Sequence, residues 1–462
     1  MLGKSCKSRT SILLTLLAVM STAVDRVDAK EYSLATGRQT GEVSQVEVLL
    51  EVGGELTLQD EKDKKTHHLK TSVVGTLVYD EKLGAAGKAA GETRGVRQYR
   101  RCDAVIKIDK GTTKARLRDD RRLVALATGE RQLTLFSPSG PLTQEELDLI
   151  TIPACSLLVE QLLPNEPVAP GDKWQHSDDL LAALLNLDAI GQSEVSTTFK
   201  EVTDTGAQLE LAGTVHGAID GVSTEIELKG RYKFDLQQNR VTWFALLVKE
   251  KRAIGHVAPG VDVTARLQMK IAPASACPAL ADEVLADFSL DPGPEQLLLE
   301  YSSPEGRFQF LHDRAWHVVS EAGKTAALRL VDRGELVAQC NVSALAAGPE
   351  GKRFTLAKFQ EDVQQSLGKH FKQFISASES ENSAGHNTCR VVASGEVETL
   401  PIQWNYYLVA DARGQQVVLA FTMEADLVER FGASDSSMLA TLRFIDAKTE
   451  MAAQPTVAPA RK

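Results

Sequence analysis

The chain has 462 residues, of which 43% are hydrophobic and 25% are charged, and its formal net charge is −10. A chain of this length exceeds what a single hydrophobic core usually organises, so we expect two or three domains. The composition is typical of a water-soluble globular protein. The acidic balance argues against general nucleic-acid binding, because proteins of that class carry a basic surface.

Residues 1–29 have the order of segments found in a secretory signal peptide. Three basic residues between positions 4 and 9 precede an apolar run at positions 12–20, and small residues follow. Cleavage is expected after Ala23 or after Ala29. The apolar run is far shorter than the ~20 residues that span a bilayer, so we expect no transmembrane anchor. The mature protein is therefore predicted to be exported, to the periplasm or to the medium.

Residues 30–272 alternate between apolar and polar side chains, a pattern that predicts β-strands. The segment from Val46 to Val52 is the first example, and Gly53-Gly54 after it predicts a hairpin turn. We predict an antiparallel β meander or open barrel with one or two helices. It forms either one domain or two β-rich halves, 30–165 and 166–272. This architecture is similar to the lipid-carrier folds of bacterial envelopes, and that similarity implies a cavity for an apolar ligand.

One segment of this domain departs from the acidic balance. Between Arg94 and Arg122 the chain has eleven basic and four acidic residues. In Lys114–Arg118 basic residues alternate with apolar ones, which places the basic side chains on one exposed strand face. The candidate surface for an anionic partner, such as an acidic polysaccharide or a lipid headgroup, consists of Arg97, Arg100, Arg101, Lys107, Lys114, Arg116 and Arg118. The alternative is a solvated outer face balanced by nearby carboxylates, which would also protect a sheet edge.

A linker and a second domain are predicted after the β-rich region. Residues 273–300 contain four prolines and little alternation, as expected of a linker. The following domain combines short strands with a helix that begins after the cap residue Thr355 and ends at Gly368. Its last segment, residues 426–444, has helical periodicity. Residues 447–462 are expected to be a disordered tail.

The order of elements in residues 301–446 resembles the PsbP-like α/β sandwich family. The matching residues are Tyr301, Phe308-Gln309-Phe310, Trp316, the helix after Thr355, Trp404–Val409 and Phe444. The family normally has a proline before the tryptophan, where this chain has Ala315. Members of the family mostly bind proteins or act as accessory factors of envelopes and photosynthesis. The resemblance therefore implies an α+β domain that binds a partner, and it supplies no catalytic residue.

The cysteines and histidines leave few candidates for a chemical site. Cys340 and Cys389 both lie in phase with apolar neighbours, which fits either a disulfide worth ~2–4 kcal/mol or two buried thiols. Five cysteines remain after cleavage of the signal peptide, so at least one is unpaired. His312 and His317 flank Asp313, but the spacing favours surface histidines over a metal site. Recognisable catalytic, phosphate-binding and metal-binding motifs are lacking, so we predict neither cofactor nor metal.

Three functions are compatible with these observations. The first is an exported, non-catalytic accessory protein of the cell envelope that binds a protein, an envelope component or a polysaccharide. The alternative is a periplasmic carrier that holds a lipid or another apolar ligand in the N-terminal β domain. The third is a hydrolase whose site is not recognisable from the sequence. A deep apolar cavity within residues 30–275 would favour the carrier.

Overall fold

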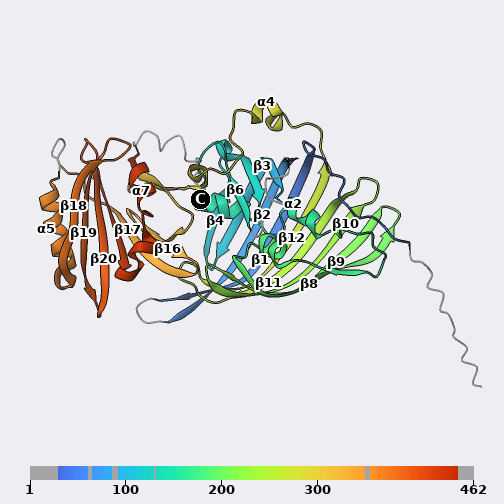
Figure 1. The fold of residues 1–462 in the computed structure, drawn as a ribbon, viewed down its shortest axis with the longest axis horizontal. Coiled ribbons are helices and arrows are strands. Elements are labelled where there is room, and N and C mark those ends of the chain that lie inside the picture. Colours follow the sequence, from blue (N-terminus) through green and yellow to red (C-terminus); the bar gives the residue numbers. More distant parts are fainter. Residues whose placement is uncertain (1–29, 61–64, 86–91, 130–131, 349–353, 446–462) are drawn as a thin grey trace, which may run out of the picture.

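The computed structural model describes residues 30–60, 65–85, 92–129, 132–348 and 354–445. The predicted signal peptide and the predicted C-terminal tail lie outside the described residues. The described chain is rich in antiparallel strands and forms two modules, which confirms the predicted β-rich fold class (Figure 1). No helix in these ranges has both the length and the apolar character needed to cross a membrane.

The N-terminal module contains a twelve-stranded antiparallel sheet. Its strands are β1 (Val43–Gln59), β2 (Thr66–Leu83), β3 (Arg94–Ile108), β4 (Gly111–Arg116), β5 (Leu123–Thr128), β6 (Leu133–Phe136), β7 (Lys173–Gln175), β8 (Ala189–Thr203), β9 (Gly206–Ile219), β10 (Val222–Asp235), β11 (Arg240–Arg252) and β12 (Gly260–Pro273). Their order is β6-β5-β3-β2-β1-β12-β11-β10-β9-β8-β7, and β4 pairs with β3. Because β1 pairs with β12, the two predicted halves belong to one continuous sheet.

The predicted hairpin at Gly53-Gly54 is wrong. Strand β1 continues through both glycines as far as Gln59. Strand β12 approaches Gly54 closely, since a Cβ atom at this position would be 2.2 Å from the carbonyl oxygen of Asp262. A glycine inside a strand often marks such a close backbone approach, and this one marks no turn.

Short helices fill part of the concave face of this curved sheet (Figure 1). They are α1 (Gln144–Ile150), α2 (Ser156–Val159), η2 (Glu160–Leu162) and α3 (Asp178–Leu185), while η1 (Asp119–Arg121) follows β4. Helix α1 begins with a capping box, in which Thr143 and Glu146 exchange hydrogen bonds. Buried residues of α2 and α3 pack with inward-facing strand residues such as Tyr79 and Phe244 to form the main core.

The predicted linker is packed against the N-terminal module. It contains the short helices η3 (Pro278–Leu280), α4 (Asp282–Leu285) and η4 (Pro294–Leu297). Leu280 and Leu285 cluster with Val96 and Leu123 of the sheet. The Lys82 ammonium donates a hydrogen bond to the carbonyl oxygen of Leu280 at 2.8 Å. These contacts fix where the C-terminal module begins.

The C-terminal module is a sandwich built on a seven-stranded antiparallel sheet of order β15-β16-β17-β21-β20-β19-β18. Its elements are β13 (Leu299–Ser303), β14 (Phe308–His312), β15 (Trp316–Ala322), β16 (Thr325–Asp332), β17 (Glu335–Ala344), α5 (Leu356–Leu367), η5 (Gly368–His370), β18 (Phe371–Glu381), β19 (Asn387–Val397), β20 (Leu400–Ala410), β21 (Gln416–Glu424), η6 (Ala425–Leu427), α6 (Val428–Phe431), α7 (Ser436–Thr441) and β22 (Arg443–Phe444). Helix α5 packs on one face, while α6, α7 and the small sheet β13-β14-β22 pack on the other. The predicted helix between Thr355 and Gly368 is confirmed.

The C-terminal module docks against the N-terminal module at two places. The β9–β10 turn meets the β16–β17 turn so closely that a Cβ atom on Gly221 would be 2.1 Å from the Cα atom of Gly334. Leu142, before α1, forms a parallel bridge with Leu299, and the Glu300 amide donates to the Leu142 carbonyl oxygen at 2.8 Å. The junction therefore lies at the end of the N-terminal sheet where β9–β10 and β11–β12 turn.

Candidate functional site

An apolar pocket of about 230 Å³ lies between the concave face of the N-terminal sheet and helix α1. Apolar parts of its wall include Leu50, Val73, Leu77, Ala104, Ile106 and Leu149. Glu145, Asp148 and Thr151 contribute polar groups. The pocket lies inside the β-rich region, where the carrier hypothesis places its ligand.

The strand register explains why space remains at this position. Leu50 pairs with Gly75 on β2 and with Leu267 on β12, and Gly75 pairs with Ala104 on β3. Directly opposed residues point to the same face of a sheet, so these side chains all face the helices. Gly75 and Ala104 leave a hollow, whereas Tyr79 fills the equivalent space further along β2. Small residues at paired positions therefore create the pocket.

The same face continues beyond the pocket with apolar side chains that are only half-buried. Val52 pairs with Val73, and Leu56 pairs with Leu69 on the neighbouring strand. All four are half-buried. The concave face thus has a packed end, filled by α2 and α3, and a half-open apolar end that begins at the pocket.

The packed end contains a buried ionic network centred on Arg97. Its Nε atom lies 2.9 Å from Oε2 of Glu81, and both side chains are at most 1% exposed. Arg97 also donates to Ser156 Oγ at 3.1 Å and to Cys155 Sγ at 2.8 Å. Burial raises the pKa of Glu81, but the charges of Arg97 and Arg38 more than offset that effect and hold the pKa below its usual value. The network joins α2 to the sheet.

The prediction that Arg97 belongs to a surface for an anionic partner is wrong, because this side chain points into the core. A β-bulge in β3 is the reason: Val78 pairs with Arg101 while the next residue, Tyr79, pairs with Tyr99. The extra residue reverses the alternation of side chains along the strand. Arg97 and Tyr99 consequently face inward before the bulge, and Arg101 faces solvent after it.

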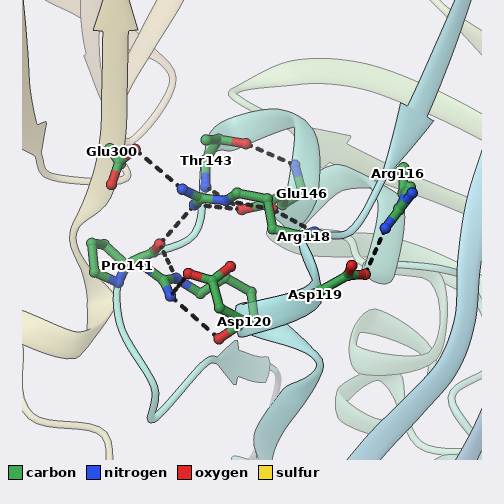
Figure 2. A network of polar contacts seen from close by, with 9 residues as sticks. Arg116, Arg118, Asp119, Asp120, Pro141, Thr143, Glu146 and Glu300 are labelled. Atoms are coloured by element: carbon green, nitrogen blue, oxygen red, sulfur yellow. Dashed lines mark hydrogen bonds and ion pairs between the residues drawn. The ribbon is translucent and has the colours of Figure 1, made fainter. Parts of the chain in front are cut away.

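Arg118 of the same predicted surface forms a joint between the modules. Its guanidinium bonds both carboxylate oxygens of Glu146 at 2.8 Å. It also reaches Glu300 at 3.2 Å and the carbonyl oxygen of Pro141 at 3.0 Å (Figure 2). Because Glu146 also closes the capping box with Thr143, Arg118 connects the start of α1 with the first strand of the C-terminal module.

The other residues of the predicted surface remain at or near solvent. The arginines face nearby carboxylates in the pairs Arg100–Asp80, Arg101–Asp103 and Arg116–Asp119. Lys107 and Lys114 are exposed on β3 and β4. These pairs offset much of the local positive charge, as the solvated-face alternative requires. An anionic partner at this surface stays a prediction.

Of the two alternatives left open for Cys340 and Cys389, the structure has the buried thiols and not the disulfide. Strands β21 and β20 lie between β17, which carries Cys340, and β19, which carries Cys389. Three strand spacings of ~4.8 Å separate the two Cα atoms by roughly 14 Å, well beyond the ~7 Å that a disulfide tolerates. The two thiols also belong to cores on opposite faces of the sheet. All five cysteines in the described ranges are free.

His312 and His317 occupy different environments. His312 was expected at the surface but is 1% exposed, and its Nδ1 atom lies 2.9 Å from the carbonyl oxygen of Asp313. Burial lowers the pKa of His312. His317 is half-buried, and its Nε2 atom lies 3.8 Å from the carboxylate of Asp220. Among the described residues, no group of three or more His, Cys, Asp or Glu side chains is arranged to hold a metal.

A second pocket, which we call the junction pocket, lies between the modules and has a volume of about 380 Å³. Strand β6 and helices α1 and α3 provide most of its wall, and Arg314 of the C-terminal module completes it. Sequence reasoning missed this pocket because its residues are far apart in the chain. For the apolar pocket, the signal available in the sequence was the presence of the small residues Gly75 and Ala104 in strands of otherwise bulky alternating residues.

No family model matches the chain, and no curated protein matches it. A segment of the chain is similar to solved structures. Cyanobacterial PsbP from Synechocystis sp. PCC 6803 is 15% identical over 32% of this chain and 92% of its own, with a TM-score of 0.26. The Ran-binding protein Mog1p of Saccharomyces cerevisiae is 11% identical over 33% and 97%, also with a TM-score of 0.26. A protein from Bacteroides thetaiotaomicron VPI-5482 is 14% identical over 32% and 49%, with a TM-score of 0.25. Similarity at this level carries no conclusion about function.

Proposed function

We propose that this protein is a non-catalytic binding protein that carries an apolar ligand on the concave face of its N-terminal sheet. The observation that supports this function is the apolar pocket between β1–β4 and α1. A protein that binds only macromolecules has no need for such a pocket inside its β-rich module. The carrier hypothesis requires one there.

The volume of the pocket limits the ligand. An engineered apolar cavity of ~150 Å³ binds benzene, whereas sites for drug-sized ligands begin near ~300 Å³. A pocket of about 230 Å³ suits one small apolar group, such as a single ring or the end of an alkyl chain. The half-buried side chains of Val52, Leu56 and Leu69 extend the apolar surface and offer a path for a longer chain.

The polar groups of the pocket disfavour an acidic headgroup near α1. Asp148 accepts a hydrogen bond from the side-chain amide of Gln144 at 2.7 Å. Although one side of Asp148 is exposed, burial by the surrounding protein raises its pKa. Glu145 also lines the pocket. We therefore propose a ligand that is neutral, or a hydrogen-bond donor, at this position.

The location and the C-terminal module belong to the same proposal. The basic and apolar pattern of residues 1–29 supports export to the periplasm or the medium. We propose that residues 301–446 form a PsbP-like domain that binds a macromolecular partner. The sequence resemblance at Phe308, Phe310 and Trp316 supports that assignment.

Binding of the neutral fluorescent probe N-phenyl-1-naphthylamine by the full chain tests the carrier function. Gly75→Val is the decisive variant, because a Cβ atom at Gly75 meets its neighbours at 3.7 Å or more and the added methyl groups enter the pocket. We expect probe affinity to fall at least about tenfold with little change in melting temperature. Decanol should displace the probe from the unmodified protein.

Gly53→Val is the matched control. Gly53 lies on the same pair of strands, and a Cβ atom there meets nothing within 4 Å. Its place in the alternation directs the new side chain to the opposite face of the sheet. The proposal is wrong if folded Gly75→Val protein binds the probe as tightly as the Gly53→Val protein, or if the unmodified chain does not bind it.

A further inference from the structure

Among the described residues, the junction pocket contains a cation without a carboxylate partner, Arg314. Arg314 precedes β15, and its guanidinium donates to the carbonyl oxygens of Leu297 at 2.8 Å and Leu135 at 2.7 Å. Within the described ranges it forms no ion pair. The nearby carboxylate of Asp313 instead accepts the backbone N–H of Ala315 at 2.8 Å. Arg314 therefore meets only neutral main-chain acceptors directly.

Withdrawing the Arg314 guanidinium from water costs free energy, and an anionic ligand would offset that cost. Burial lowers the pKa of Arg314, and the charge of Asp313 offsets this only in part. Charged groups that are withdrawn from water are usually paired or hydrogen-bonded in folded proteins, because removal from water is unfavourable. An unpaired guanidinium in the wall of a pocket of about 380 Å³ is suited to receive an anionic group.

A carboxylate occupies another part of the same wall. Asp188, which follows α3, accepts the backbone N–H of Asp220 at 2.6 Å. Although one side of Asp188 is exposed, burial by the surrounding protein raises its pKa, and the charged groups that act on it include Asp220 and Arg252 but not Arg314. Asp188 and Arg314 consequently line one pocket without neutralising each other.

The remainder of the wall is largely apolar and includes Leu133, Leu135, Leu147, Ala183 and Leu187. We propose that the junction pocket binds a small zwitterion, with its carboxylate at Arg314, its ammonium group at Asp188 and a short alkyl stretch against the apolar wall. The volume lies within the ~300–1,000 Å³ range of small-molecule sites. This inference does not rest on the carrier function, because the two pockets share only Thr151 among their lining residues.

The position of the pocket gives the ligand a second effect. Arg314 belongs to the C-terminal module, whereas the other lining residues belong to the N-terminal module. A zwitterion that contacts both charges therefore favours the docked arrangement of the two modules over a separated one. Ligand binding should consequently stabilise module docking, and docking should strengthen ligand binding.

Isothermal titration calorimetry on the full chain provides the test. The probes are the ω-amino acids γ-aminobutyrate, 6-aminohexanoate and 8-aminooctanoate, with hexanoate and hexylamine as singly charged references. At least one ω-amino acid should bind about tenfold or more tightly than both references, since each charge-assisted contact adds to affinity. Arg314→Gln should remove the advantage over hexylamine, and Asp188→Asn the advantage over hexanoate.

Arg413→Gln is the matched control, because it removes an exposed arginine of the same module from the β20–β21 turn, at the end of the sheet opposite the β16–β17 turn, and should leave the affinities unchanged. Arg314→Gln also deletes two main-chain contacts. If that variant does not fold, Asp188→Asn decides the question, because asparagine retains an acceptor for the Asp220 N–H. Absence of binding by every probe at roughly 10 mM would overturn the proposal. So would equal binding of zwitterions and references, or a preference for zwitterions over hexanoate that survives in Asp188→Asn.

Discussion

The two modules use antiparallel sheets in different ways. The seven-stranded sheet of the C-terminal module has a packed layer on each face, with Trp316 and Phe421 in one core and Phe359 and Trp404 in the other. The twelve-stranded sheet packs one end of its concave face and leaves the other end half-open. The sandwich thus uses both faces for its own stability. The N-terminal sheet retains apolar surface beyond its own core, and this surface is available to a ligand.

Charged side chains at the packed end of the N-terminal sheet and at the junction between the modules also differ. At the packed end of the N-terminal sheet, Arg97 is fully buried and its charge is matched by Glu81. At the junction, Arg314 is half-buried, and within the part of the chain that the structure describes its guanidinium bonds main-chain carbonyl groups and no carboxylate. A matched buried pair is consistent with a structural role, whereas an unmatched charge beside a pocket indicates a binding role.

The largest effect is expected from breaking the sandwich. Trp316→Ala removes a fully buried ring whose Nε1 atom donates to the Ser434 carbonyl oxygen at 3.1 Å. Loss of a large core aromatic costs about 3–5 kcal/mol, so denaturant unfolding should show a destabilisation of that size. Trp243→Ala, which removes a half-buried tryptophan from the N-terminal module, is the control with a smaller expected loss. Similar losses of unfolding free energy in the two variants would contradict the expectation that Trp316 contributes more to stability than Trp243.

A pH effect of intermediate size is expected at the packed end of the N-terminal sheet. His176 lies 2.9 Å from Thr197 Oγ1, and burial lowers its pKa to about 4. The ordinary value of ~6.5 applies in the unfolded chain, so the unfolded state binds more protons below that pH. Stability from this group is complete above pH ~6.5 and falls as the pH drops towards 4, by at most about 3 kcal/mol.

Unfolding free energies measured at neutral pH and near pH 4.5 test the role of His176. His176→Gln should reduce the pH dependence, because the variant no longer has a side chain that must remain neutral in the fold. The exposed residue His216 provides the control variant His216→Gln, which should retain the dependence assigned to His176. Equal pH dependence in the two variants would show that burial of His176 contributes nothing.

Local features of the fold were predictable from the sequence, but pairings between distant segments were not. Alternation from Val46 to Val52 correctly indicated a strand, and the cap residue Thr355 correctly indicated a helix start. Gly53-Gly54 misled because a glycine pair is typical of turns and also permits close strand packing. The pairing of β1 with β12 depends on contacts across more than two hundred residues, which no local pattern encodes.

The candidate sites were less predictable for a related physical reason. The inward position of Arg97 follows from a β-bulge that changes the phase of β3, and a bulge has no reliable local pattern. The apolar pocket depends on Gly75 facing Ala104, which requires the register of two strands. Arg314 reaches the junction pocket only because two modules dock. The positions of Arg97, the apolar pocket and Arg314 all depend on which distant residues face each other in the fold, and no local sequence pattern specifies those pairings.

The smallest expected effect locates the boundary between the packed and half-open ends. Leu50 and Leu267 are direct register partners on neighbouring strands, but Leu267 is 2% exposed and Leu50 is half-buried beside the apolar pocket. Leu50→Ala should cost about 1 kcal/mol because its side chain already borders open space, whereas Leu267→Ala should cost about 2–5 kcal/mol. Equal losses in chemical denaturation would place Leu50 inside the packed core and leave the proposed ligand without one of its walls. A small loss at Leu50 together with weakened probe binding would instead show that this side chain contributes to the ligand site more than to folding.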